Sequence, residues 1–394
     1  MNGSTNGHST VLEAAPATHM NGGNTTLLPR IHEALELVHS PYSSNESRQQ
    51  ASVFLEDIKA NDEAPYHGFT LASDKSQQPV VRHYALSLLE HAIKHKWAEY
   101  SQDQATALRE WVLQLSQNIE PEDPLYLRNK TAQLWVEIAK RSWGAEWLDM
   151  DELLVRLWEL PGSVVHKEFV LFVLETLSDE VFNGEDTVAA LREGALSKSC
   201  VEIFTPAIVL AEAFPNRQVG TAVRHGEEGW LVRMGDLLSQ CLGTDAFQDK
   251  QYQTCAVKTL AVYKSVMPWA IPRAIASASC VQHMCTSLAA SSVAVQLVSS
   301  HGCPSWHEHI LANNYRLLSR LFMRCIAGYI SQTKSFYPSS APCTRAKWLI
   351  CFENYSTGQS LTLATLTTKS IYLQRSFPRH EPQSMILTSH IDQI

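Results

Sequence analysis

Residues 77–97 read QQPVVRHYALSLLEHAIKHKW, and the apolar positions among them recur at intervals of three and four. This spacing places the apolar side chains in one stripe along a helix of about four or more turns. The segment is therefore predicted to be an amphipathic helix that buries one face. The stripe consists of Val81, Tyr84, Ala85, Leu88, Leu89, Ala92, Ile93 and Trp97.

Segments with the same spacing lie on both sides of this helix. They fall within residues 51–58, 105–119, 132–139 and 153–158, and no comparable segment alternates with the period of two that is typical of a β-strand. The chain from about residue 27 is therefore predicted to be all helical. Residues that interrupt helices separate the segments. These are Pro41, Pro65, Pro79, Pro121, Pro124, Pro161, Gly162, Asn183 and Gly184.

The predicted helices also come in pairs. The second helix of each pair is expected to begin near residues 44, 79, 124 and 163, which is close to the roughly 40-residue period of paired-helix repeats. One hairpin cannot cover its own apolar face, so neighbouring hairpins must stack. The predicted fold class is all-α, with HEAT-type helical-hairpin repeats stacked into an α-solenoid, an ARM-like superhelix. The alternative is an irregular helical domain without a true repeat.

Composition limits the function. The chain has 394 residues, and its formal net charge of −8 argues against a protein that binds nucleic acid mainly by bulk attraction. This charge fits a partner with a basic face and does not exclude a local basic groove for RNA. No phosphate-binding loop, Gly-x-Ser-x-Gly elbow or dinucleotide fingerprint occurs, so an enzyme is the weakest class, and no cofactor is expected.

The two ends differ from the helical region. Residues 1–26 are rich in Asn, Gly, Ser and Thr and are predicted to be a disordered tail that lacks a secretory signal. Residues 291–394 are predicted to be a poorly ordered or non-native tail, because they carry no helical stripe long enough to stack. No apolar run is long enough for a membrane span. None of the nine cysteines precedes Cys200, which favours free thiols in a reducing compartment.

Several segments resemble the opening of the importin-β superfamily. RQQASVFLEDIK (48–59) resembles the second helix of the first repeat, and residues 77–97 and YLRNKTAQLWVEIAKRSW (126–143) resemble the repeats that follow. LWELPGSVVHKEFVLFVLETLSDEVF (157–182) looks most like the exportin-5 branch, in particular its fungal members, and a weaker resemblance continues through residues 252–275. The resemblance covers about two-thirds of the chain, but only the N-terminal third or less of a full receptor.

The resemblance implies a nuclear export receptor that shuttles between nucleus and cytoplasm. Residues 27–142 would form importin-β N-terminal-like repeats that bind Ran in its GTP form, and residues 143–290 would form exportin-type HEAT repeats. The implied cargo is protein or structured small RNA, bound on the concave face, and nucleoporins are further implied partners. Membrane insertion is not implied. The alternative is a helical-repeat scaffold or adaptor that works without Ran.

The resemblance also suggests where Ran would bind, because the second helices of family members face it. The departure is Glu90, since importins often have Leu-Lys-Asn where this chain has Leu89-Glu90-His91; a Ran contact at residue 90 is therefore in doubt. An alternative explanation of the basic clusters at helix ends, without a partner, is that their charge complements the helix dipole. The candidate Ran-binding residues are Arg82, Lys94, Lys96, Trp97, Lys140 and Arg141.

Two histidine groups have spacings that could suit a metal. His91 and His95 lie on one face of the predicted helix, but no glutamate stands between them, so a solvated or partner-facing pair is favoured over zinc. The second group matches no standard zinc motif, and no metal site is predicted. It consists of His301, Cys303, His307 and His309.

Cysteines and tryptophans are assigned to the core. Cys280 and Cys285 are expected to be buried free thiols. For the tryptophans, packing between repeats is favoured over stacking on RNA bases, because most of them sit on the apolar stripes. They are Trp97, Trp135, Trp143, Trp147 and Trp158.

Overall fold

The computed structural model describes residues 27–161, 164–184, 186–217, 223–243, 249–288, 290 and 295. Within these residues the regular elements are helices, with one isolated bridge between Trp143 and Trp147. The two predicted tails lie outside the described residues, apart from residue 295, and so does the cluster around His301.

The chain forms two compact units. Among the described residues, the first unit comprises 27–147 and 156–176, and the second comprises 148–155 and those from Leu177 onward. Helices α7 (Met150–Trp158) and α8 (Val165–Phe182) therefore contribute residues to both units.

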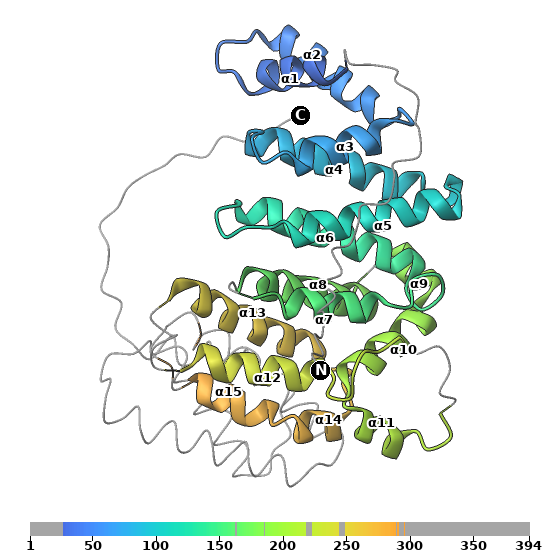
Figure 1. Ribbon diagram of the computed structural model, residues 1–394, viewed down its shortest axis with the longest axis vertical. Coiled ribbons are helices and arrows are strands. Elements are labelled where there is room, and N and C mark those ends of the chain that lie inside the picture. The colour runs from blue at the N-terminus through green and yellow to red at the C-terminus, as the bar shows by residue number, and fades with distance from the viewer. Residues whose placement is uncertain are drawn as a thin grey trace, which may run out of the picture. The chain divides into compact units, whose positions relative to one another are not determined.

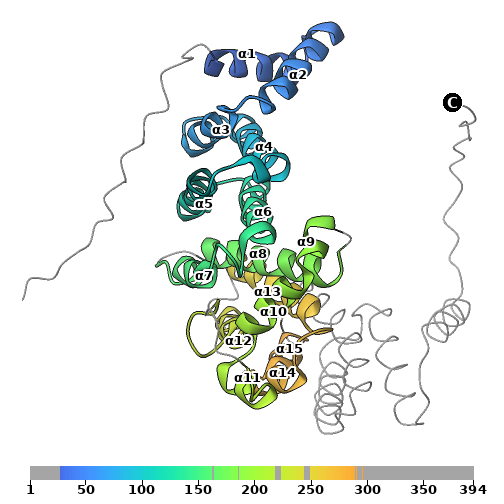
Figure 2. The ribbon, with the colours of Figure 1, turned by 90° about the vertical axis from the view of Figure 1, so that its right-hand side faces the viewer.

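The first unit is a stack of helical hairpins (Figure 1). Successive helices pack against each other as pairs, α1 with α2, α3 with α4, and α5 with α6. The pairs also stack in register, because α3 packs on α5 and α4 packs on α6 (Figure 2). First helices thus form one side of the stack and second helices the other. The bounds are α1 Leu27–His39, α2 Asn45–Lys59, α3 Ala64–Ser73, α4 Pro79–His95, α5 Gln102–Gln117 and α6 Leu125–Ser142.

The second helices begin where the repeat spacing predicted. They start at Asn45, Pro79, Leu125 and Val165, within two residues of the expected positions. The breakers mark helix starts for physical reasons, since Pro79 occupies the first helical position, where no backbone donor is needed. Ser101 caps α5 by accepting from the amide of Gln104. The all-α, HEAT-type solenoid fold class is confirmed for the described residues.

The predicted stripe on α4 forms the centre of the first unit. Seven of its members, from Val81 to Ile93, are buried, and only Trp97 lies outside the helix. Each buried large apolar side chain contributes roughly 1.5–3 kcal/mol to stability. The Tyr84 hydroxyl adds a hydrogen bond to the Leu55 carbonyl at 2.7 Å, which joins α4 to α2. The apolar stripe therefore fixes how α4 faces its neighbours.

Close approach of α3 to α4 depends on a glycine. A Cβ atom at Gly68 would lie 2.8 Å from the Ala85 carbonyl oxygen and 3.1 Å from the Leu88 Cβ. These distances leave no room for a side chain, so α3 can lie directly on the backbone of α4 only because residue 68 is glycine.

The second unit is held by buried polar and aromatic contacts. Asp151, from the first turn of α7, accepts hydrogen bonds from the Trp230 indole and the His225 amide, each at 2.6 Å. Trp269 stacks on Phe182 with ring centroids 4.1 Å apart. The helices are α9 Thr187–Leu191, α10 Glu193–Phe204, α11 Ala207–Ala213, α12 Trp230–Cys241, α13 Lys250–Val266, α14 Pro272–Ser277 and α15 Cys280–Leu288.

The cysteines and tryptophans lie in the core where they are described. Four cysteines are buried free thiols, Cys280 among them, whereas the side chain of Cys285 lies outside the described part. The tryptophans were predicted to pack in the core, and this is confirmed for four of them, each with at most 8% of its surface exposed. These are Trp135, Trp143, Trp147 and Trp158.

No helix among the described residues is long and apolar enough to cross a bilayer.

Candidate partner-binding face

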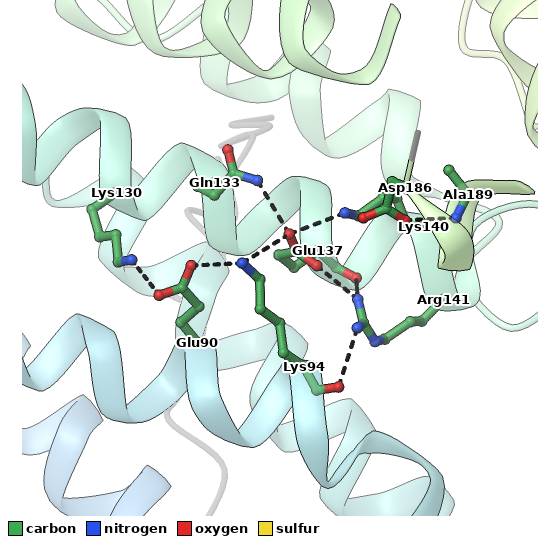
Figure 3. Close-up of polar contacts among 9 residues, drawn as sticks. All are labelled: Glu90, Lys94, Lys130, Gln133, Glu137, Lys140, Arg141, Asp186 and Ala189. Atoms are coloured by element: carbon green, nitrogen blue, oxygen red, sulfur yellow. Dashed lines mark hydrogen bonds and ion pairs between the residues drawn. The ribbon is translucent and has the colours of Figure 1, made fainter. Parts of the chain in front are cut away.

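Charged side chains gather where the second helices α4 and α6 lie side by side (Figure 3). On α4 the spacing of four residues puts two of them on the same side of the helix, and on α6 spacings of four and seven do the same. Because α4 packs on α6, the two rows meet. We call this group the α4–α6 face. It consists of Glu90 and Lys94 from α4, and Lys130, Glu137 and Arg141 from α6.

Glu90 bridges the two helices. One carboxylate oxygen accepts from the Lys94 ammonium at 3.0 Å, and the other is paired with the Lys130 ammonium. Partial burial opposes ionisation of Glu90, but the hydrogen bonds from Lys130 and Lys94 outweigh it and hold the pKa of the carboxyl below its ordinary value. Glu90 is therefore an anion held between two lysines at neutral pH.

Glu137 is the buried centre of the face. Only 3% of its side chain is exposed, and its carboxylate pairs with Lys140 at 3.0 Å and with Arg141 at 2.8 Å. Burial again opposes ionisation, yet these cations, with Lys140 foremost, hold the pKa of Glu137 below its ordinary value. A buried carboxylate is tolerated only when it is paired in this way. Glu137 thus anchors the cations around it.

Lys94 links the two carboxylates and is the most exposed member of the face. Its ammonium lies 3.5 Å from Glu137 as well as 3.0 Å from Glu90, and 37% of its side chain is exposed. Arg141 donates to the Lys94 carbonyl at 3.3 Å, which fixes the end of α4 on α6. The cation that points most to solvent is therefore held in place from below, while the central carboxylate is covered.

The predicted Ran-binding residues fall in different places. Lys94 and Arg141 belong to the α4–α6 face, and Lys140, only 1% exposed, is buried beneath it. Lys140 therefore contributes to the face through its ion pair with Glu137. A contact of these residues with Ran stays a prediction.

The remaining three predicted residues lie away from this face. Arg82 pairs with Asp123 at 2.6 Å and donates to the Ala72 carbonyl at 3.2 Å. Lys96 was expected to be part of the helix, but α4 ends one residue earlier, at His95. The Lys96 ammonium donates to the Ala60 carbonyl at 2.6 Å. Trp97 begins a short 3-10 helix, Trp97–Glu99, and is half-buried. Arg82 thus connects α4 to α3 and to the loop before α6, and Lys96 connects the residue after α4 to the end of α2.

Sequence reasoning noted Glu90 only as a departure from the family pattern, and it missed Glu137 and the ion pairs of both glutamates. Glu90–Lys94 and Glu137–Arg141 are four residues apart on their helices, and this signal could have been read. The ion pair between Glu90 and Lys130 could not have been predicted from the sequence, because it depends on how far α4 is shifted along α6. A further pair, Arg128 with Glu168 at 2.6 Å, joins α6 to α8 within the first unit.

The histidine pair on α4 has no additional ligand. The His91 and His95 rings lie 4.7 Å apart, and the described residues contain no group of three or more side chains that could hold a metal. Burial is the main cause that lowers the pKa of His91, and the neighbouring His95 and nearby lysines lower it further. This environment favours a neutral imidazole near the α2 side of α4.

Comparison with known proteins finds a family match within the first unit. Residues 51–134 match the importin-beta N-terminal domain family. The match runs from within α2 to within α6 and so includes the α4 half of the face. Over these residues the chain is similar to the N-terminal part of importin-β superfamily members.

Exportins are among the individual relatives that the chain is similar to. It is 32% identical to the protein Msn5 of Saccharomyces cerevisiae over 222 residues, which is 53% of this chain and 18% of Msn5. It is 27% identical to exportin-5 of Dictyostelium discoideum, over 41% of this chain, and 29% identical to human exportin-5, over 39%. The chain spans only 13–14% of these exportin-5 proteins. The chain is thus similar to exportins over part of its own length and a small part of theirs.

Proposed function

We propose that this chain is part of a nuclear export receptor that binds Ran in its GTP form through the second helices of the first unit. The observation that supports this most is the position of the importin-β N-terminal match, which covers α3, α4 and α5 and most of α6. The α4–α6 face lies on those helices and presents Lys94 to solvent. The role proposed is binding, with no catalytic step by this chain.

The other partners follow from the same proposal. Cargo, either protein or structured small RNA, would bind along the stacked second helices, nucleoporins would be further partners, and the receptor would shuttle between nucleus and cytoplasm. Two ligands that stabilise the same arrangement of a stack of hairpins help each other to bind, and the help is mutual. A coupling of about 1–3 kcal/mol changes each affinity by roughly 5–150-fold.

A nucleotide-dependent binding experiment tests the proposal. The full 394-residue chain is immobilised and exposed to Ran loaded with a non-hydrolysable GTP analogue or with GDP. An export receptor retains the GTP-analogue form and releases the GDP form. Equal retention of the two forms, or of neither, rejects Ran dependence and favours the alternative of a helical-repeat scaffold.

The direction of transport needs a second measurement. With a cargo in hand, Ran loaded with the GTP analogue should strengthen cargo binding if the receptor exports. Loss of cargo on addition of Ran would indicate import instead.

A further inference from the structure

We propose that the α4–α6 face binds a carboxylate-bearing segment of a protein partner, and that Glu90 competes with that segment from within the chain. This inference rests on the proposed function only in taking the second helices as the partner-binding side. It adds the chemistry of the partner group and a residue that sets its affinity.

The exposure of the charges points to an acidic partner. Lys94 is 37% exposed, and Lys130 keeps 21% of its side chain exposed, whereas Glu137 is covered to 97%. A carboxylate approaching from solvent therefore meets ammonium groups before it meets the central anion. Complementary charge of this kind guides and orients a protein partner.

Glu90 already occupies the two ammonium groups that such a partner would use. One of its carboxylate oxygens pairs with Lys94 of α4 and the other with Lys130 of α6. One internal anion thus holds one lysine from each helix. Its side chain is itself 19% exposed, so water and a competing anion can reach it. An incoming carboxylate would replace an existing ion pair rather than create a new one. The favourable free energy of binding is therefore smaller than it would be without Glu90.

Lys94 is the residue best placed to change partners. It is 3.0 Å from Glu90 and 3.5 Å from Glu137, so release of Glu90 leaves it beside a second anion. Its backbone stays fixed, because Arg141 binds the Lys94 carbonyl. The ammonium group can turn outward on its flexible stem while α4 stays in place.

The same arrangement fits nucleic acid poorly. A phosphate backbone needs a continuous run of cations. Along α4 and α6 the lysines alternate with Glu90 and Glu137, and the Arg141 guanidinium is turned toward Glu137 with 9% of its side chain exposed. Two lysines around one anion suit one or two carboxylates of a folded or extended protein segment.

Replacing Glu90 should therefore tighten binding. In Glu90→Gln the amide no longer holds the two lysines by charge, and we expect affinity for an acidic ligand to rise three- to tenfold at low salt. Lys94→Gln should weaken binding by a similar factor. Raising the ionic strength should reduce both effects, because exposed charges are screened.

The experiment uses a fluorescent octaglutamate peptide and, separately, Ran loaded with the GTP analogue. Dissociation constants are measured for the full chain and for Glu90→Gln and Lys94→Gln. The matched controls are Glu110→Gln, exposed on α5, and Lys198→Gln, exposed on α10, which make the same charge changes away from the face. Thermal unfolding of each variant confirms that the fold is retained.

The octaglutamate peptide tests the role of Glu90, and Ran tests the proposed function. Tighter peptide binding by Glu90→Gln, weaker binding by Lys94→Gln and no change in the controls support the inference, whether or not Ran is bound. A folded Glu90→Gln variant that binds the peptide no better than the unchanged chain overturns it, and so does an equal gain in Glu110→Gln. If Ran still binds by nucleotide state in that case, the proposed function stands and only the role of Glu90 is rejected.

Discussion

Asp151 shows how one residue can set the pH dependence of the second unit. Burial raises the pKa of this carboxyl from 3.8 to about 6, although the His225 amide and the Trp230 indole stabilise its charged form. A carboxyl whose pKa is higher in the folded state favours folding when it is protonated. Its contribution therefore rises as pH falls from about 7 to about 4.

Comparison with Asp151→Asn isolates this effect. Relative to the variant, the unchanged chain should gain about 2 kcal/mol of unfolding free energy between pH 7 and pH 4.5, as expected from a shift of about two pKa units. Histidines with lowered pKa oppose the gain in both proteins, so the difference between the two urea titrations is the quantity to measure. A difference that stays constant over this pH range contradicts the assignment.

Glu137 provides a second test at the residue scale. Glu137→Gln removes the buried carboxylate that pairs with Lys140 at 3.0 Å and with Arg141 at 2.8 Å, and breaking a buried ion pair typically costs about 3 kcal/mol or more. Urea unfolding should show a clear drop in the midpoint. The control is Glu110→Gln, an exposed change on α5 that should alter stability by less than about 0.5 kcal/mol. Equal midpoints would mean that Glu137 is not the anchor of the face.

The contact between α3 and α4 belongs to the element scale. Gly68→Ala places a methyl group 2.8 Å from the Ala85 carbonyl oxygen, so the two helices must separate at a cost of about 1–3 kcal/mol. Gly194→Ala on α10 is the matched control, because the added carbon would meet no atom within 4 Å beyond its chain neighbours and the backbone of its own helix. It should be neutral or slightly stabilising, since alanine favours a helix more than glycine does. Similar melting temperatures for the two variants would contradict the close packing.

The elements also show what the sequence could predict. Helix starts were predictable to within two residues because Pro79 and the breakers before the other second helices act locally. Helix pairing followed from spacing alone. The contacts of Lys96 with Ala60, and of Glu90 with Lys130, were not predictable, because each joins residues more than 30 positions apart through the packing of whole helices.

At the scale of the whole molecule, the resemblance to a family could be recognised in the sequence before the site could. Three N-terminal segments carry the resemblance to importin-β receptors, and the family match over residues 51–134 agrees with them. The candidate basic residues were harder to judge, since a lysine in a sequence looks the same whether it faces a partner or, like Lys140, lies buried beside a glutamate. Burial separates these cases, and only the fold supplies it.

Hydrogen exchange of the full chain tests most directly whether the second helices form the partner-binding side. Ran loaded with the GTP analogue should slow exchange of amides in α4 and α6, residues 79–95 and 125–142, while α3 and α5 exchange as before. Ran loaded with GDP should change neither set. Protection confined to α3 and α5, or protection of α4 and α6 that is the same with GDP, would contradict the proposed mode of binding.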